Sequence, residues 1–312
     1  GGGGGGDGPV LPGMPEGDVL YDSFTVNNIV DLTVIQQYRV IEGRLTINNT
    51  QLTRISLPNL ESVGFISIQS NDLLTQVDLP RLTTVTGYVD VRSNQRLPSF
   101  VLPSVTSVGE YFRIESNSAL TTLDAPQLAT VTDYFRLYNN GALTTLDGAF
   151  AALQTVGGYF RMYYNHALTT WGTAFQALTQ VESYLAIHSQ DRLTEIRLPA
   201  LQTIGGHLTI GSDDDNDAND VLRHIGFPAL TTIRGDCRRS NLQEPYTCVT
   251  NQAYSLDISF NYQLPNCLRD YYTDGANVTR IVGDAYSAHG RDDCQCALVD
   301  GEMRATCPDD AP

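Results

Sequence analysis

Apolar and polar side chains alternate within short stretches of this chain, and the stretches recur about every 23 residues. Apolar side chains stand two positions apart, as Phe160 and Met162 do, with a polar or aromatic residue between them. This period of two predicts a strand that buries one of its faces. The inward positions of successive copies are Ile47, Ile68, Val91, Ile114, Leu137, Met162, Ile187 and Ile210.

The second half of a typical copy reads Leu-x-x-Ile-x-Leu-Pro-x-Leu-x-x-Val in residues 52–63, and again, ending in Ile, in residues 193–204. Proline lacks an amide donor, so it favours a corner over the middle of a strand ladder. A phrase this short cannot bury its own apolar side chains and must stack on its neighbours. We therefore predict a mainly β fold, a right-handed β-helix or solenoid of about eight rungs with short helical caps.

An asparagine follows the strand in most copies. Asparagines stacked at a corner can bond the turn backbone and one another, much as amide side chains do in cross-β stacks. The expected members of this column are Asn49, Asn71, Asn94, Asn117, Asn140 and Asn165.

The ends of a solenoid need covering because they leave strand edges open. Residues 27–37 fit a short helix over the first rung, with Asn27 or Asn28 as its N-cap, and residues 264–273 fit a second helix at the other end. We expect a Gly- and Pro-rich flexible arm or tether at residues 1–18. The solenoid and its N-terminal helix should then occupy residues 19–250, and a cysteine-containing cap residues 251–312.

The cysteines are confined to the region where the repeat stops. An even number of them favours disulfides that staple the open end, with Cys267 joined to the turn at Cys294 and Cys296. Reduced thiols or a metal site are the alternatives, but the spacing of Cys294 and Cys296 is wrong for a zinc knuckle. Disulfides predict an oxidising, extracytoplasmic location. The six residues are Cys237, Cys248, Cys267, Cys294, Cys296 and Cys307.

The charge balance narrows the choice of partners. Lys and Arg number 19 against 35 Asp and Glu, for a formal net charge of −16. This acidity argues against nucleic acid and anionic membranes as partners. Apolar runs are all well short of the roughly 20 residues that span a bilayer, so we do not expect a membrane-embedded protein.

The repeat phrase resembles that of the receptor L-domain family, whose members include the ligand-binding lobes of insulin and epidermal growth factor receptors. The similarity lies in residues 111–117, Tyr-Phe-Arg-Ile-Glu-Ser-Asn, in the spaced Leu, Pro and Val that follow, in the N-terminal helix and in the cysteine-stapled end. It covers about residues 20–300. The furin-like modules and kinase of the receptors are absent, so hormone-receptor function does not carry over. The Gly-rich leader and the Cys294-Gln295-Cys296 end are closer in character to bacterial secreted or surface-anchored members. That resemblance implies an extracellular or cell-surface location, with tethering through the N-terminus.

Residues between the inward strand positions should point outward and align in columns about 4.8 Å apart. We expect these columns to form a water-facing Tyr/Arg face. Two interpretations remain open: a ladder that stabilises the sheet, with pairs such as Arg113 and Glu115, or a binding surface rich in hot-spot residues. The candidate binding residues are Tyr88, Tyr111, Arg113, Tyr134, Arg136, Tyr138, Tyr159, Arg161, Tyr163 and Tyr184.

An acidic insertion interrupts the last full rung at residues 211–220. Asp213, Asp215 and Asp217 alternate there and could supply oxygen ligands to Ca²⁺, the one cofactor that the sequence suggests. A solvated acidic loop is the alternative.

The sequence lacks the common signatures of hydrolases, phosphate-binding loops and zinc proteases, so we expect no enzymatic activity. We predict a non-catalytic extracellular or cell-surface protein that recognises a protein or glycan through the Tyr/Arg face. The alternative is a self-assembling subunit of an extracellular filament, whose N-terminal arm contacts the next copy.

Overall fold

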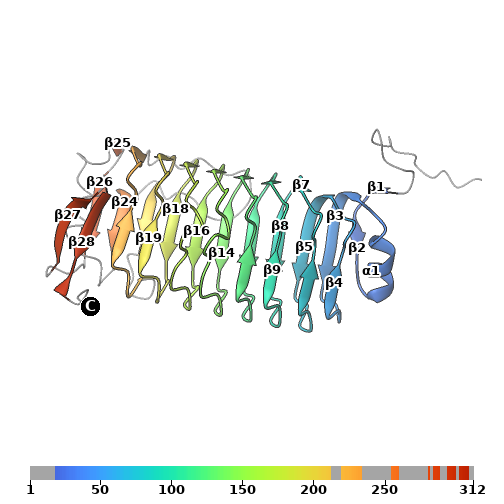
Figure 1. Ribbon diagram of the computed structural model, residues 1–312. Helices are drawn as coiled ribbons and strands as arrows, with labels where there is room; N and C mark the ends of the chain where they lie inside the picture. The colour runs from blue at the N-terminus through green and yellow to red at the C-terminus, as the bar shows by residue number, and fades with distance from the viewer. Residues whose placement is uncertain are drawn as a thin grey trace, which may run out of the picture.

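The computed structural model describes residues 18–211, 219–233, 254–259, 280–281, 284–288, 294–299 and 302–308. The chain winds into a parallel β-solenoid of about eight turns, an elongated rod with α1 near one end and the C-terminal strands at the other (Figure 1). The prediction of a mainly β solenoid is confirmed.

The longest wall of the rod is a parallel sheet built from one strand per rung. Register is kept from rung to rung: Phe112 pairs with Phe135, and Phe135 pairs with Phe160. These strands are β3 (Val40–Asn48), β5 (Ser62–Gln69), β8 (Val89–Arg92), β11 (Phe112–Glu115), β14 (Phe135–Tyr138), β16 (Phe160–Tyr163), β18 (Leu185–His188), β21 (Leu208–Ile210), β24 (Tyr254–Ser259) and β26 (Asp284–Ala288).

Shorter strands form the other walls. Two-residue strands continue the sheet around one corner: β7 (Thr84–Val85), β10 (Ser107–Val108), β13 (Thr130–Val131), β15 (Thr155–Val156), β17 (Gln180–Val181), β20 (Thr203–Ile204), β23 (Thr232–Ile233) and β25 (Arg280–Ile281). Parallel pairs lie on a further side: β4 (Arg54–Ser56) with β6 (Gln76–Asp78), β9 (Ser99–Val101) with β12 (Thr122–Asp124), and β19 (Glu195–Arg197) with β22 (His224–Gly226). Each rung thus contributes two or three short strands.

The interior is apolar along the described length of the rod. Phe112, Phe135 and Phe160 stack with centroids 5.4 and 5.0 Å apart. Phe150 and Phe175, which come from the two longer copies, are fully buried and meet this stack edge-on. The extra residues of those copies therefore widen the rung enough to admit a second layer of rings.

A ladder of buried side-chain amides runs along one corner. Asn117 accepts hydrogen bonds at Oδ1 from the backbone N and Nδ2 of Asn94, and its Nδ2 donates to the backbone O of Val91. Asn71, Asn94, Asn140 and Asn165 occupy equivalent positions and are also fully buried. Each amide thus satisfies backbone groups of the preceding rung that would otherwise be buried without a partner.

The predicted first member of the ladder is wrong. Asn49 is exposed and has a left-handed backbone (φ 55°), and Thr50 takes the ladder position, bonding Oδ1 of Asn71 through its N and Oγ1. The same left-handed conformation recurs just before each ladder residue. It allows the chain to turn the corner and aim the next side chain inward.

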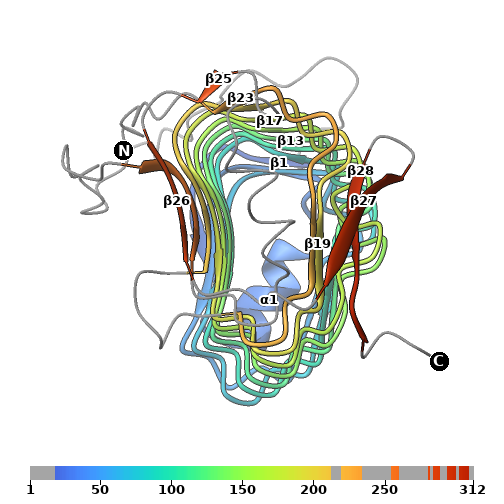
Figure 2. The ribbon, with the colours of Figure 1, turned by 90° about the vertical axis from the view of Figure 1, so that its left-hand side faces the viewer.

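The N-terminal end carries the one helix of the described residues, α1 (Ile29–Ile35). Asn28 caps it by accepting from the N of Val30 and Asp31 at 2.8 and 3.1 Å. Leu32 and Ile35 join the core, and α1 lies across the end of the coil (Figure 2). β1 (Val19–Leu20) and β2 (Phe24–Thr25) pair with β3 at this end. The expected N-terminal helix is therefore present, though shorter than residues 27–37.

At the C-terminal end, parallel pairing continues past residue 250, because β24 pairs with β21 and β26 with β24. An antiparallel hairpin, β27 (Gln295–Val299) and β28 (Glu302–Thr306), lies outside the coil (Figure 2). Cys294 and Cys307 form a disulfide at its base, and Cys296 is also disulfide-bonded. Cys237, Cys248 and Cys267, the helix expected at residues 264–273 and the arm before residue 18 lie outside the described residues.

Candidate functional site

The aromatic column of the Tyr/Arg face is aligned as the repeat predicts. Its rings stand in register just before each strand of the long sheet, with Tyr111 4.6 Å from both Tyr88 and Tyr134 and nearly parallel to each. Tyr159, Tyr184 and His207 continue the stack at 4.6–4.9 Å. Tyr134, Tyr159 and Tyr184 form an apolar cluster of their own, separate from the core. Parallel pairing at one strand per rung dictates this spacing.

The expectation that these rings face water is wrong for three of them. Tyr134, Tyr159 and Tyr184 are only 3, 5 and 8% exposed, and Tyr163 and Arg136 are buried as well. Each stacked ring is covered on both faces by the rings above and below, which the sequence pattern does not reveal. The remaining candidates, Tyr88, Tyr111, Arg113, Tyr138 and Arg161, are half-buried.

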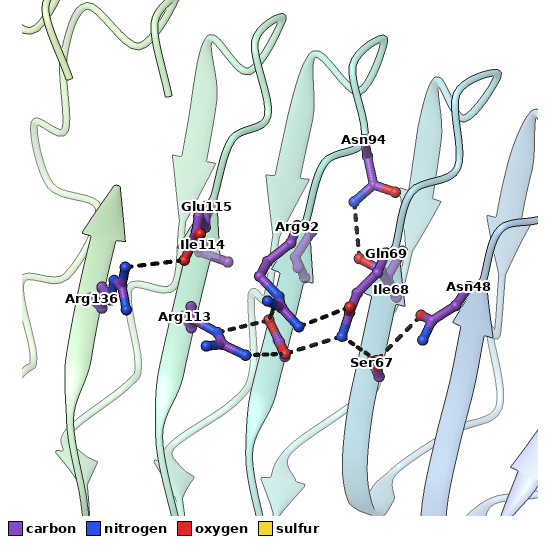
Figure 3. Close-up of polar contacts among 12 residues, drawn as sticks. Asn48, Ser67, Ile68, Gln69, Arg92, Asn94, Arg113, Ile114, Glu115 and Arg136 are labelled. Carbon is purple, nitrogen blue, oxygen red and sulfur yellow. Dashed lines mark hydrogen bonds and ion pairs between the residues drawn. The ribbon is translucent and has the colours of Figure 1, made fainter. Parts of the chain in front are cut away.

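A buried carboxylate, Asp90, organises the polar column beside the rings. Its partners Gln69, Arg92 and Arg113 lie on neighbouring strands of the long sheet (Figure 3). Arg113 from the next rung binds it with two hydrogen bonds, Nε to Oδ1 at 3.1 Å and Nη2 to Oδ2 at 2.7 Å. Arg92 approaches Oδ1 to 2.9 Å, and Gln69 donates to Oδ2 at 3.1 Å. Asp90 therefore has three partners on three successive rungs. The sequence analysis did not place it in the site, although it stands in the arginine column.

The other arginines of the face are also engaged. Arg136 lies 3.5 Å from Glu115, donates to the hydroxyl of Tyr163 and faces the rings of Tyr138 and Tyr163. Arg161 lies 4.0 Å above the ring of Tyr163. Arg113 thus pairs with Asp90, and Glu115 pairs with Arg136 instead of with Arg113 as expected. Carboxylates and rings between the arginines relieve the repulsion that three stacked cations would otherwise suffer.

The titration of these groups follows from burial. Burial raises the pKa of the Tyr111 and Tyr134 hydroxyls well above the ordinary value, so both stay protonated at neutral pH. Burial lowers the pKa of Arg113, but its hydrogen bond to Asp90 and the charge of that carboxylate outweigh burial and raise it overall. The centre of the face is therefore a fixed lattice of neutral rings and paired charges.

An accessible hollow of about 480 Å³ lies at the N-terminal end of the face. Arg44 stands exposed at its side, with its guanidinium carbon 5.5 Å from the ring centroid of Phe65 and 5.4 Å from that of Tyr88. The hollow is lined by Ser23, Thr25, Gly43, Arg44, Thr46 and Phe65. The sequence analysis missed this site: Arg44 and Phe65 stand in the aligned columns, but the alignment does not show that Ser23 and Thr25 lie next to them.

A second hollow, of about 310 Å³, lies where the β27–β28 hairpin meets β19 and β22. Its lining includes Glu195, His224 and Arg304, and His224 Nε2 is 3.8 Å from Glu195 Oε1. The calcium ligands expected at Asp213, Asp215 and Asp217 lie outside the described residues. Within the described ranges, no three His, Cys, Asp or Glu side chains gather as a metal site.

Comparison with family models, with curated proteins and with solved structures found no match. The resemblance to receptor L-domains therefore stays a prediction. In the part of the chain that the structure describes, no helix combines the length and the apolar character needed to cross a bilayer.

Asp90→Asn tests whether the buried lattice holds the face together. The change leaves Arg113, whose side chain is 11% exposed, without its counter-charge, so we expect the free energy of unfolding to fall by about 3 kcal/mol. Asp78→Asn is the matched control, because Asp78 pairs with the exposed Arg54 and should lose less than about 1 kcal/mol. Urea denaturation measures both, and equal losses would contradict the role of Asp90.

Asp133, just before Tyr134, gives a pH-dependent prediction. Burial, together with the charge of Glu110, raises the pKa of this carboxyl to about 6. A raised pKa means that stability is full below the unfolded value near 4 and is lost as pH rises through about 6. Asp133→Asn should therefore be more stable than the parent at pH 8, by about 1 kcal/mol once solvent screening of a half-buried group is allowed for, and equal to it at pH 4.

The control for this experiment is Asp147→Asn. The backbone and hydroxyl hydrogen bonds from Thr173 lower the pKa of Asp147, so this variant should lose stability at neutral pH. Thermal unfolding measured from pH 4 to pH 8 distinguishes the two trends. A parallel trend in both variants would show that Asp133 is not destabilised by its charge.

Proposed function

We propose that this chain is a non-catalytic recognition protein of the extracellular space or cell surface, binding a protein or glycan ligand through the Tyr/Arg face. A solenoid offers long, continuous surfaces and is commonly used for binding. The Cys294–Cys307 disulfide fits an oxidising compartment. Both features support the proposal without naming the ligand.

The observation that carries the proposal is the accessible N-terminal end of the face. There the exposed Arg44 and the half-buried Phe65 line a hollow, and the half-buried rings of Tyr88 and Tyr111 follow on the next two rungs. The stacked lattice behind them is rigid, so a ligand would meet side chains that lose little freedom on binding. Aromatic residues and arginine are the types that contribute most at interfaces.

Tyr88→Leu tests this location. The variant keeps an apolar side chain in the column but removes the ring and hydroxyl, so binding should weaken at least tenfold, as for a hot-spot residue. The measurement is adsorption of the labelled full chain to arrays of polysaccharides and extracellular matrix proteins, with circular dichroism to verify folding. Arg54→Gln, on the separate β4–β6 sheet, should bind like the parent. Adsorption to nothing on the arrays would contradict the recognition function itself.

A second candidate function, self-assembly into a filament, is favoured by exposed apolar side chains at both ends of the rod. On α1, Ile29, Val30 and Val34 are 62, 67 and 43% exposed, on the side opposite the buried Leu32 and Ile35. The β27–β28 hairpin exposes Leu298 (61%) and Val299 (41%). Two unlike patches at opposite ends suit a head-to-tail contact, which propagates if it does not close.

Val30→Asp tests this alternative. Charge on the outer face of α1 should disfavour end-to-end contact, so assemblies of the parent chain would dissociate toward monomers in size-exclusion chromatography. The Val30 side chain is exposed, so the fold should persist. A parent chain that stays monomeric at high concentration, or assemblies unaffected by the change, would contradict end-to-end assembly.

A further inference from the structure

We propose that the hollow lined by Ser23, Thr25, Gly43, Arg44, Thr46 and Phe65 binds one sugar ring that carries a carboxylate, a hexuronate. The inference rests on the proposed recognition function and deepens it, by naming a ligand class and the place where one ring of the ligand sits.

The hollow exists because the column of rings stops there. Every ring from Tyr88 to Tyr184 lies between two others, whereas Phe65 has a ring neighbour, Tyr88 at 5.1 Å, on one side only. The column position of the preceding rung is held by Arg44, which pairs with Phe65 in the strand register. An arginine therefore holds the column position where a further ring would follow, and its guanidinium lies beside the stack, 5.5 Å from Phe65 and 5.4 Å from Tyr88.

Small residues keep the space beside Arg44 open. Phe24 pairs with Leu45, which brings Ser23 opposite Arg44, and the Oγ of Ser23 accepts from the N of Arg44 at 2.9 Å. A Cβ at Gly43 would come within 2.4 Å of the backbone N of Ser23, so no side chain can project from this position. The outermost strand thus passes close to β3 without filling the column.

Arg44 differs from Arg92, Arg113 and Arg136 in having no carboxylate partner among the described residues. Arg92, Arg113 and Arg136 have carboxylate partners within 3.5 Å. Arg44 makes no ion pair with any described residue, and its guanidinium lies beside the rings of Phe65 and Tyr88. An exposed guanidinium of this kind is suited to bidentate binding of a carboxylate. Long-range repulsion from the acidic protein is screened beyond about 8 Å at physiological ionic strength.

The remaining lining fits a sugar better than an aromatic side chain. The hydroxyls of Thr25 and Thr46 have no hydrogen-bond partner among the described residues, and Ser23 adds a third hydroxyl. A pyranose ring can lay its C–H face on Phe65 while its hydroxyl groups bond these side chains. An aromatic ring would stack on Phe65 as well, but it would offer the three hydroxyls no hydrogen-bond partner. The volume, about 480 Å³, is within the range of small-molecule sites and exceeds that of one pyranose ring.

Two probes that differ only at the carboxylate test the assignment: methyl glucuronoside and methyl glucoside. Ligand-observed NMR with the full chain should show the glucuronoside binding at least tenfold more tightly. Arg44→Gln should remove this preference, and Phe65→Ala should weaken both probes. Arg54→Gln, an exposed arginine on another sheet, should change neither.

Equal binding of the two probes by the parent chain, or an undiminished preference in Arg44→Gln, would overturn the inference. Arg44 is exposed, so its variant stays informative even if Phe65→Ala fails to fold. Array binding that depends on Tyr88, combined with no effect of Arg44, would refute this ligand assignment while leaving the recognition function standing. No array binding and no probe binding would remove both.

Discussion

The structure depends on strict register between consecutive rungs. Parallel pairing places residues beside their counterparts one copy later, about 4.8 Å away, with register shifts only near the two ends of the described rod, between Ile41 and Arg44 and between Tyr254 and Leu256. The buried amide ladder enforces this register, because an asparagine such as Asn117 bonds the backbone of the preceding rung through both its oxygen and its nitrogen. A slip by one residue would leave these groups unpaired inside the protein and turn the apolar positions outward.

Register also brings like charges together, and a few departures from the repeat offset their repulsion. A perfect repeat stacks identical residues, which benefits phenylalanine and tyrosine but not arginine. Asp90 stands one rung before the run of Arg113, Arg136 and Arg161, and Glu115 lies beside Arg136 in the next column. The repeat is therefore kept where rings and amides gain from stacking, and carboxylates beside the arginine run offset the repulsion within it. Arg44 follows neither pattern, because it lies at the end of the column and outside the charge lattice.

The sequence predicts the fold well because the signal is periodic. A recurrence of about 23 residues with alternating apolar positions leaves few alternatives to a stacked coil, and the sequence narrows the N-cap of α1 to Asn27 or Asn28, of which Asn28 is the cap. Side-chain directions that depend on the exact geometry of a corner are harder to predict. Asn49 and Thr50 are adjacent and both polar, and only the left-handed turn decides which one points inward.

The candidate site is less predictable for a physical reason. Alternation tells which way a side chain points but not what covers it, so Tyr134 and Tyr159 were expected in water although each lies between neighbouring rings. The partner of Arg113 could not be chosen from the sequence, because Glu115 is two residues away on the same strand and Asp90 is the counterpart of Arg113 on the preceding rung. The hollow near Arg44 lies where the column of rings ends, and a periodic pattern does not predict a cavity at such a position.

The amide ladder also bears on how this protein ages chemically. Asn140 precedes Gly141, a pairing in which the glycine backbone N readily attacks the asparagine side-chain carbonyl, releasing ammonia and forming a cyclic imide that water then opens to a carboxylate. Here the amide of Asn140 is held by the backbone O of Ile114, the N of Asn117 and Oδ1 of Asn165, which keeps it from reaching the attacking nitrogen. Deamidation should thus be slow while the rod is wound and fast once that corner opens. A chain altered in this way would carry a negative charge at a buried position, which opposes refolding. The modification would therefore record that the molecule had once unfolded.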